Sequence, residues 1–103
     1  MSKYLLAYHG GGMPSSPEEQ QRVLGAWEAW FGRLGAAVAD PGNPCGAART
    51  IAADGSISDG RPSVSGYSVI EATSLDEAVR LAKDCPVLQS GASIEVLETV
   101  PAM

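Results

Sequence analysis

The sequence predicts one α+β domain of the ferredoxin-like split β-α-β type, in which two helices cover one face of an antiparallel sheet. Two segments, residues 17–34 and 75–85, carry apolar residues at helical spacing. Short segments typical of strands precede, separate and follow them. The length of 103 residues is the usual size of one domain, so we expect a single domain over residues 1–103.

The first strand is predicted at residues 3–8, because KYLLAY is a short run rich in leucine and tyrosine. Three glycines at residues 10–12 end this strand. His9, the single histidine of the chain, lies between the strand and these glycines.

The first helix is predicted to begin at Pro17, a residue suited to the first helical position, after Ser16 as the N-cap. Gly35 is suited to the C-cap that ends it. The apolar positions expected on its buried face are Val23, Ala26, Trp27, Trp30, Phe31 and Leu34.

The segment after this helix is rich in small residues, glycine and proline, and contains β-like pieces at residues 36–39 and 47–53. The pair Asp54-Gly55 predicts a hairpin turn, with Ile57 in the short piece that follows. A further turn is predicted at Asp59-Gly60-Arg61-Pro62.

The second half repeats the order strand, helix, strand. Residues 63–72 predict a strand, and Ser74 with Glu77 forms the capping-box pattern of a helix that Pro86 stops. The residues expected on one face of this helix are Leu75, Ala78, Val79, Ala82 and Cys85. Residues 92–99 predict the last strand, in which Ile94 and Val96 alternate with Glu95 and Leu97.

The predicted helices cover only one face of the sheet. We therefore expect the other face to pack against a second copy of the chain, giving a homodimer.

The composition disfavours several classes of function. A net charge of −5 with few, scattered basic residues disfavours binding to nucleic acid or to an anionic membrane. Two cysteines without CxxC spacing and one histidine make a zinc site unexpected, and the glycine run lacks the pattern of a nucleotide-binding loop. We expect no metal and no organic cofactor. Two isolated thiols and the absence of a signal-peptide pattern predict a cytoplasmic protein.

An ordered set of short motifs resembles the YCII-related domain family, and more narrowly its DGPF-type branch. The motifs are Asp59-Gly60-Arg61-Pro62, the segment GYSVIE at residues 66–71, SLDEA at 74–78, AKDCP at 82–86, and Gly91 with IEV at 94–96. The helix with Trp27 and Trp30 fits as well, so the resemblance runs through nearly the whole chain. The chain departs from the D-G-P-F signature, because Arg61-Pro62 follows Asp59-Gly60 and the phenylalanine is missing.

The resemblance implies a dimeric α/β barrel of ferredoxin-like subunits, with a pocket at the edge of the barrel in each subunit. It implies a histidine from the first strand region and an aspartate from the DG turn as acid–base partners, and His9 and Asp59 match these positions. Most members of the family have no established activity, and a few act on small, often aromatic or halogenated molecules.

Each of these two residues has a functional and a structural interpretation. An imidazole with an ordinary pKa of about 6.5 exchanges protons at neutral pH, and the glycines after His9 leave space for a ligand. The alternative for His9 is a strand-end histidine bonded to a backbone carbonyl. Asp59 is expected to orient His9, and the alternative is a turn aspartate that caps its own backbone.

The other residues predicted at the pocket are Tyr8, Gly10, Trp27 and Arg61. Trp27 would stack on an aromatic ligand, Tyr8 would present its hydroxyl, and Arg61 would bind a carboxylate or phosphate. The alternatives are packing in the core for Trp27, packing in the core or dimer interface for Tyr8, and a solvated loop position for Arg61.

Together these observations predict a cofactor-free enzyme for a small molecule that uses a His-Asp pair, His9 and Asp59, for proton abstraction followed by elimination or isomerisation. The alternatives are a non-catalytic small-molecule-binding or regulatory dimer module, and a purely structural dimer.

Overall fold

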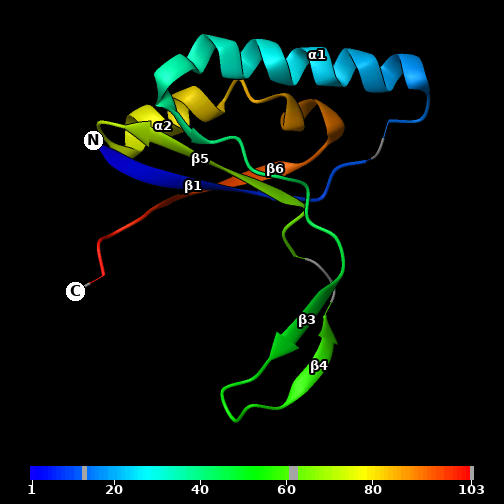
Figure 1. Cartoon of the computed structure of the whole chain (residues 1–103), viewed down its shortest axis with the longest axis vertical. Helices are drawn as coiled ribbons and strands as arrows, with labels where there is room; N and C mark the ends of the chain where they lie inside the picture. Colours follow the sequence, from blue (N-terminus) through cyan, green and yellow to red (C-terminus); the bar gives the residue numbers. More distant parts are fainter. Residues whose placement is uncertain (13, 61–62, 103) are drawn as a thin grey trace.

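The computed structural model describes residues 1–12, 14–60 and 63–102. Its main sheet has four antiparallel strands in the order β2-β5-β1-β6. Their bounds are Ser2–His9 for β1, Val38–Asp40 for β2, Gly66–Ala72 for β5 and Ser93–Glu98 for β6. The first strand lies in the middle and pairs with β5 on one side and β6 on the other. This order and the two helices on one face (Figure 1) confirm the predicted fold class.

The helices are α1, Pro17–Leu34, and α2, Leu75–Ala82, with 3₁₀ turns η1, Gly35–Ala37, and η2, Pro86–Ser90. Both α-helices begin with the predicted caps: the hydroxyl oxygens of Ser16 and Ser74 each accept a hydrogen bond at 3.1 Å from the backbone N–H three residues later. In the described residues, no helix is long and apolar enough to cross a membrane.

A glutamate completes the cap of each helix. The carboxylate of Glu19 accepts hydrogen bonds from the Ser15 hydroxyl and backbone, and that of Glu77 accepts from the Thr73 backbone and hydroxyl. These hydrogen bonds lower the pKa of both carboxyl groups. Each glutamate thus binds the residue before the N-cap, whereas in a capping box it would bind the backbone N–H of the N-cap residue.

The prediction that α2 continues to Pro86 is wrong. The helix ends at Ala82, and Pro86 begins η2. The reason is local, because a residue before proline is disfavoured in helical conformation, and Cys85 is extended with φ −65° and ψ 130°. Two residues expected on the buried face of α2, Leu75 and Val79, remain partly exposed.

The core lies between the sheet and the helices. Tyr4, Leu6 and Tyr8 of β1 alternate toward this side, as the period of two in a strand requires. They pack with Trp30 of α1, whose ring N–H donates to the carbonyl oxygen of Leu81 at 3.2 Å. The predicted alternation of β6 is confirmed as well, since Ile94 and Val96 pack against this core.

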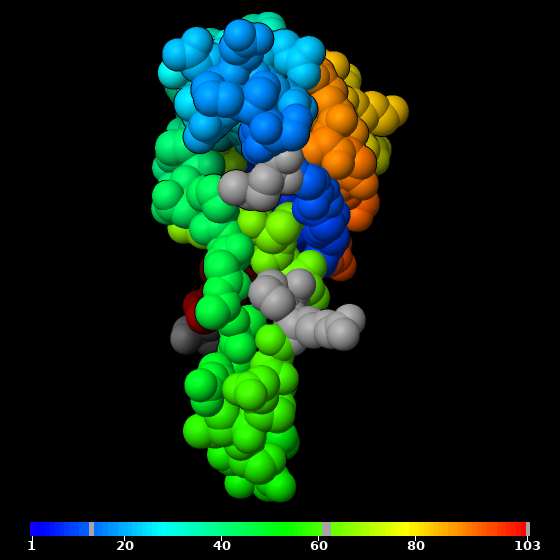
Figure 2. Space-filling view, turned by 90° about the vertical axis from the view of Figure 1, so that its right-hand side faces the viewer, coloured from blue at the N-terminus to red at the C-terminus, as the bar shows by residue number. Residues whose placement is uncertain are grey.

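The remaining two strands, β3 (Ala48–Ile51) and β4 (Ile57–Gly60), form a separate hairpin that we call the arm. It stands away from the body, on the side of the main sheet opposite the helices (Figures 1 and 2). The predicted turn at Asp54-Gly55 is confirmed, because Gly55 has φ +88° and the Asp54 carboxylate accepts from the Ser56 N–H at 2.9 Å.

The turn predicted at residues 59–62 is not observed where the structure describes it. Asp59 and Gly60 belong to β4, in which Asp59 lies opposite Arg49 of β3. The cross-strand pairs Arg49–Asp59 and Ala48–Gly60 extend the ladder through the Asp-Gly pair. Arg61 and Pro62, the other half of this prediction, lie outside the described residues.

Gly42, which follows β2, provides a test of the close approach between this segment and the backbone of β5. Its φ is +77°, and a Cβ atom there would lie 1.7 Å from the carbonyl oxygen of Tyr67. Gly55 has a similar φ, but no atom lies within 4 Å of the position that its Cβ would take. Gly55→Ala therefore measures the cost of the positive φ without a steric clash. We expect Gly42→Ala to lower the free energy of unfolding by roughly 1–3 kcal/mol more than Gly55→Ala in urea denaturation. Equal losses in the two variants would show that the close approach carries no cost.

Candidate functional site

His9 is the last residue of β1 and lies beside Ser93 of β6. Successive side chains of a strand point to opposite faces, so His9 faces away from the helices. We call this side of the sheet the open face. The strand register places on it Leu5, Ala7 and His9 of β1, Tyr67 and Val69 of β5, and Glu95 and Leu97 of β6.

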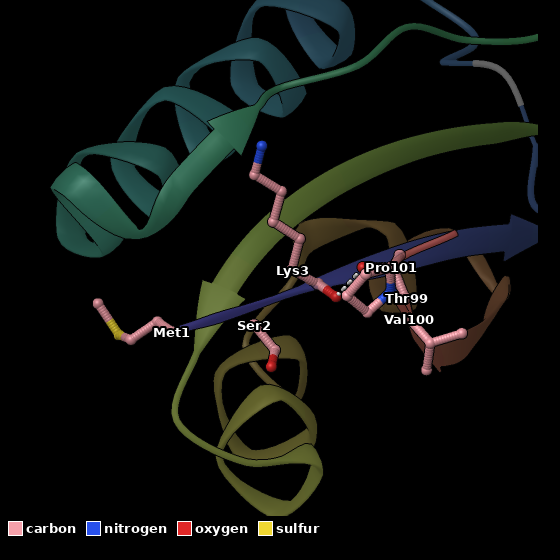
Figure 3. A pocket seen from close by; sticks show the side chains of 6 residues that line it. All are labelled: Met1, Ser2, Lys3, Thr99, Val100 and Pro101. Carbon is pink, nitrogen blue, oxygen red and sulfur yellow. Dashed lines mark hydrogen bonds between the residues drawn. The ribbon is translucent and has the colours of Figure 1, made fainter. Parts of the chain in front are cut away.

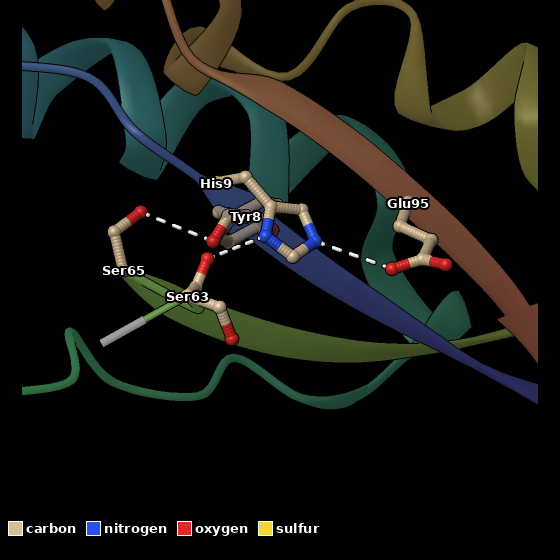
Figure 4. Close-up of polar contacts among 5 residues, drawn as sticks. All are labelled: Tyr8, His9, Ser63, Ser65 and Glu95. Carbon is tan, nitrogen blue, oxygen red and sulfur yellow. Dashed lines mark hydrogen bonds and ion pairs between the residues drawn. The ribbon is translucent and has the colours of Figure 1, made fainter. Parts of the chain in front are cut away.

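Both ring nitrogens of His9 have an oxygen partner (Figure 4). Nδ1 donates to the carbonyl oxygen of Ser63 at 2.5 Å, and Nε2 lies 3.2 Å from a carboxylate oxygen of Glu95. A carbonyl oxygen only accepts, so the Ser63 contact keeps a proton on Nδ1. An ionised carboxylate also only accepts, so Glu95 is placed to accept from Nε2 when the ring carries both protons and is charged. In the neutral ring with its proton on Nδ1, Nε2 is the nitrogen left to accept a proton.

The position of the Ser63 carbonyl is fixed by Ser65. The Ser65 backbone N–H and hydroxyl both donate to the carbonyl oxygen of Tyr8, at 2.7 and 3.1 Å. These two bonds hold the segment before β5 against the end of β1 (Figure 4). The orienting contact of His9 therefore comes from backbone that is itself held in place.

Glu95 is a site residue that sequence reasoning missed. The predicted alternation of the last strand put it on the face opposite Ile94 and Val96, but only the pairing of β6 with β1 brings it to His9. The His9 side chain is 33% exposed and that of Glu95 62%, so a ligand can reach both from solvent. The pair offers a proton acceptor beside a carboxylate at one end of the open face.

The structure places Asp59 on the arm. Its side chain is 91% exposed, and a carboxylate oxygen lies 3.3 Å from Nε of Arg49. Among the described residues of one chain, no hydrogen bond joins Asp59 to His9. Pairing of these two groups stays a prediction.

Tyr8 and Trp27 lie on the helix side of the sheet, away from His9. The Tyr8 hydroxyl donates to the Ser68 hydroxyl at 2.8 Å, and burial raises the pKa of Tyr8. The rings of Tyr8 and Trp27 pack edge to face, with their centroids 5.6 Å apart.

Gly10 follows His9 directly, is exposed, and has open space where a side chain would stand. Arg61 lies outside the described residues.

His9 lines neither of two shallow hollows on the described surface. One of about 330 Å³ lies at the start of α1, between Ser16 and Arg22. The other, of about 320 Å³, is lined by residues 1–3 and 99–101, where Thr99 donates hydrogen bonds to the carbonyl oxygen of Lys3 (Figure 3). Within a single chain, the His9–Glu95 pair thus lies outside both hollows. The described residues contain no group of three or more side chains suited to hold a metal ion.

Comparison with known proteins gives a family and a fold. The family model described as the YCII-related domain matches residues 6–100. Among solved structures, the chain is similar to 5-chloro-2-hydroxyhydroquinone dehydrochlorinase from Burkholderia phenoliruptrix AC1100, in its complex with 2,5-dihydroxybenzoquinone. The match has a TM-score of 0.58 and 22% identity, and it covers 97% of this chain and 95% of the other. None of the curated proteins compared with the chain matches it.

Proposed function

Because the chain belongs to the YCII-related domain family, we propose that it is a cofactor-free enzyme that acts on a small molecule, with His9 as its acid–base group. The observation that carries this proposal is the pair of contacts of His9. The Ser63 carbonyl oxygen lies 2.5 Å from Nδ1, and a carboxylate oxygen of Glu95 lies 3.2 Å from Nε2. This is the arrangement of a base whose tautomer is fixed and whose cation is stabilised.

The chemistry that suits this pair is proton abstraction followed by elimination. In a keto tautomer, the ring carbon that bears the leaving group is saturated. Nε2 of His9 takes a proton from a hydroxyl group of this tautomer, and the electron pair of that O–H bond forms a carbonyl. The adjoining ring double bond shifts to the saturated carbon, the leaving group departs from that carbon with its bonding pair, and His9 returns the proton to water. Atoms and electrons balance without an oxidant or a metal. Loss of HCl from a chlorinated substrate is one example of this class.

The ligand class that we propose is a hydroxylated aromatic ring or a quinone. The similar dehydrochlorinase was solved with 2,5-dihydroxybenzoquinone. On the open face of this chain, Tyr67 and Ala7 lie in one row with Glu95, and Leu5 lies in the next row. An apolar surface beside one acid–base pair suits a flat ring that carries a few polar groups.

A non-catalytic small-molecule-binding or regulatory dimer module is the second candidate. It is favoured by the separation of the predicted acid–base pair within one chain, because the Asp59 carboxylate contacts Arg49 on the arm. Both candidates include a homodimer that packs open face to open face. The row Val69–Leu5–Leu97 is apolar, and no helix in the described part of the chain covers it. In such a dimer, the predicted His9–Asp59 pair would form between the His9 of one copy and the Asp59 of the other.

Chloride release separates the two candidates. Under anaerobic conditions, we expect the protein to release chloride from 5-chloro-2-hydroxyhydroquinone faster than buffer does, and His9→Gln to remove this effect. Glu28→Gln, a change of an exposed carboxylate on α1, is the matched control and should leave the rate unchanged. Calorimetric binding of 2,5-dihydroxybenzoquinone without chloride release would favour the binding module. If the protein neither binds this quinone nor releases chloride, the proposed ligand class loses its support.

We also propose membership of the DGPF-type branch, one domain over residues 1–103 and a cytoplasmic location. The Asp59-Gly60 pair supports the branch, and the family match over residues 6–100 supports the single domain. The thiols of Cys45, exposed, and Cys85, buried, are both free, which suits a reducing compartment. Burial raises the pKa of the Cys85 thiol, so this group is not suited to act as a nucleophile.

A further inference from the structure

The arm exposes apolar side chains that the other described residues of the chain do not cover. Its two strands pair only with each other, and a two-stranded hairpin alone is marginally stable in water. Ile51 and Ile57 lie opposite one another near its tip and are 70% and 64% exposed. Such a pair of isoleucines on a projecting hairpin indicates a packing partner outside the chain.

A second exposed apolar patch lies at the other end of the sheet. Met1 and Val100 are 84% and 74% exposed and line the 320 Å³ hollow together with Pro101 (Figure 3). We call this hollow the terminal corner. Among the described residues, the large hydrophobic side chains with the highest exposure are these two and the two isoleucines of the arm.

The arm and the terminal corner are related by their places on the open face. The corner lies where β1 begins, and the arm leaves the body where β1 ends, because Gly66 pairs with both Tyr8 and Pro44. The arm and the C-terminal segment both stand on the side of the sheet opposite the helices (Figure 1). The two apolar patches thus flank the face that is free to receive a second copy.

A two-fold dimer with this face as its interface can bring the two patches together. When the sheets stack with their β1 strands antiparallel, the arm end of each copy meets the corner end of the other. Packed sheets lie about 10 Å apart. Ile51 follows Pro44 by seven residues, which span up to about 23 Å when extended, so the arm is long enough to pass the partner's sheet.

We propose that the arm of each copy packs Ile51 and Ile57 into the terminal corner of a second copy, so that two reciprocal contacts clasp the dimer. The charges agree with this pairing, because Lys3 lines the corner and Asp54 lies at the tip of the arm. This inference rests on the homodimer proposed above, and it adds the surface that holds the dimer together.

Dimer dissociation constants measured by sedimentation equilibrium test the contact. We expect Ile57→Lys and Val100→Asp each to weaken the dimer at least about tenfold, which is about 1.4 kcal/mol. The double variant should regain part of this loss, since the new charges are opposite and face each other across the contact. Thr50→Lys, on the other face of the arm, is the matched control and should leave the constant unchanged.

Each other outcome overturns a stated part of the proposal. A wild-type chain that is monomeric would refute the homodimer and the clasp together. A dimer that neither single variant weakens would refute the clasp and leave the homodimer standing. Weakening without recovery in the double variant would show that the arm and the corner do not contact one another.

Discussion

Replacing His9 by glutamine is expected to lower the rate of the proposed elimination by about 10²–10⁴-fold, the usual contribution of a positioned acid–base group. A glutamine amide still donates a hydrogen bond and fills similar space, but it has no nitrogen that takes up a proton at neutral pH. Initial rates of chloride release, measured at several substrate concentrations, would give kcat and kcat/KM for both proteins. A variant with the wild-type rate would remove His9 from the mechanism.

The same assay identifies the carboxylate that serves His9. Glu95 lies 3.2 Å from Nε2, whereas the carboxylate of Asp59 contacts Arg49 on the arm. We therefore expect Glu95→Gln to lower the rate while Asp59→Asn changes it little. The reverse order would favour the His9–Asp59 pair predicted from the sequence, with Asp59 supplied by the arm of the second copy.

Replacing Trp30 by alanine is expected to lower the free energy of unfolding by roughly 3–5 kcal/mol. Trp30 is fully buried, its ring lies 5.1 Å from that of Phe31 and 5.8 Å from that of Trp27, and its N–H is bonded to Leu81. Truncation removes these contacts and leaves a cavity between α1 and the sheet. A domain of this size is stable by only about 5–15 kcal/mol, so the loss is a large share.

Urea denaturation followed by circular dichroism measures this loss. Leu24→Ala on the same helix is the matched control, because Leu24 is half exposed and its truncation should change the stability by at most about 0.5 kcal/mol. Equal effects of the two substitutions would show that Trp30 does not hold α1 on the sheet.

Much of the fold follows from local sequence signals. The apolar run of β1, the alternation in β6 and the serine caps of both α-helices each depend on neighbours within a few residues, and all were predictable. The predictions failed where pairing or a following residue decides the outcome. Asp59-Gly60 has the composition of a turn, but the register with Arg49 makes it strand. Cys85 has a helical position in the apolar pattern, but the proline after it holds it extended.

The candidate site was predictable only in part for the same reason. His9 is found by its type and by the glycines that follow it. Its contacts come from Ser63 and Glu95, which are 54 and 86 residues away in the chain. The strand order β5-β1-β6 creates this neighbourhood, and no local spacing encodes it. The alternation of β1 likewise turns Tyr8 to the opposite face from His9, although the two residues are adjacent.

The most direct test of the proposed acid–base role is the location of the protons on the His9 ring, measured by long-range ¹⁵N–¹H correlation NMR. His9 is the only histidine, so its signals need no assignment by mutation. We predict that the neutral ring carries its proton on Nδ1, facing the Ser63 carbonyl, and that 2,5-dihydroxybenzoquinone shifts the Nε2 signal. A neutral ring with its proton on Nε2 would contradict the proposal, because the nitrogen meant to accept a proton would already hold one.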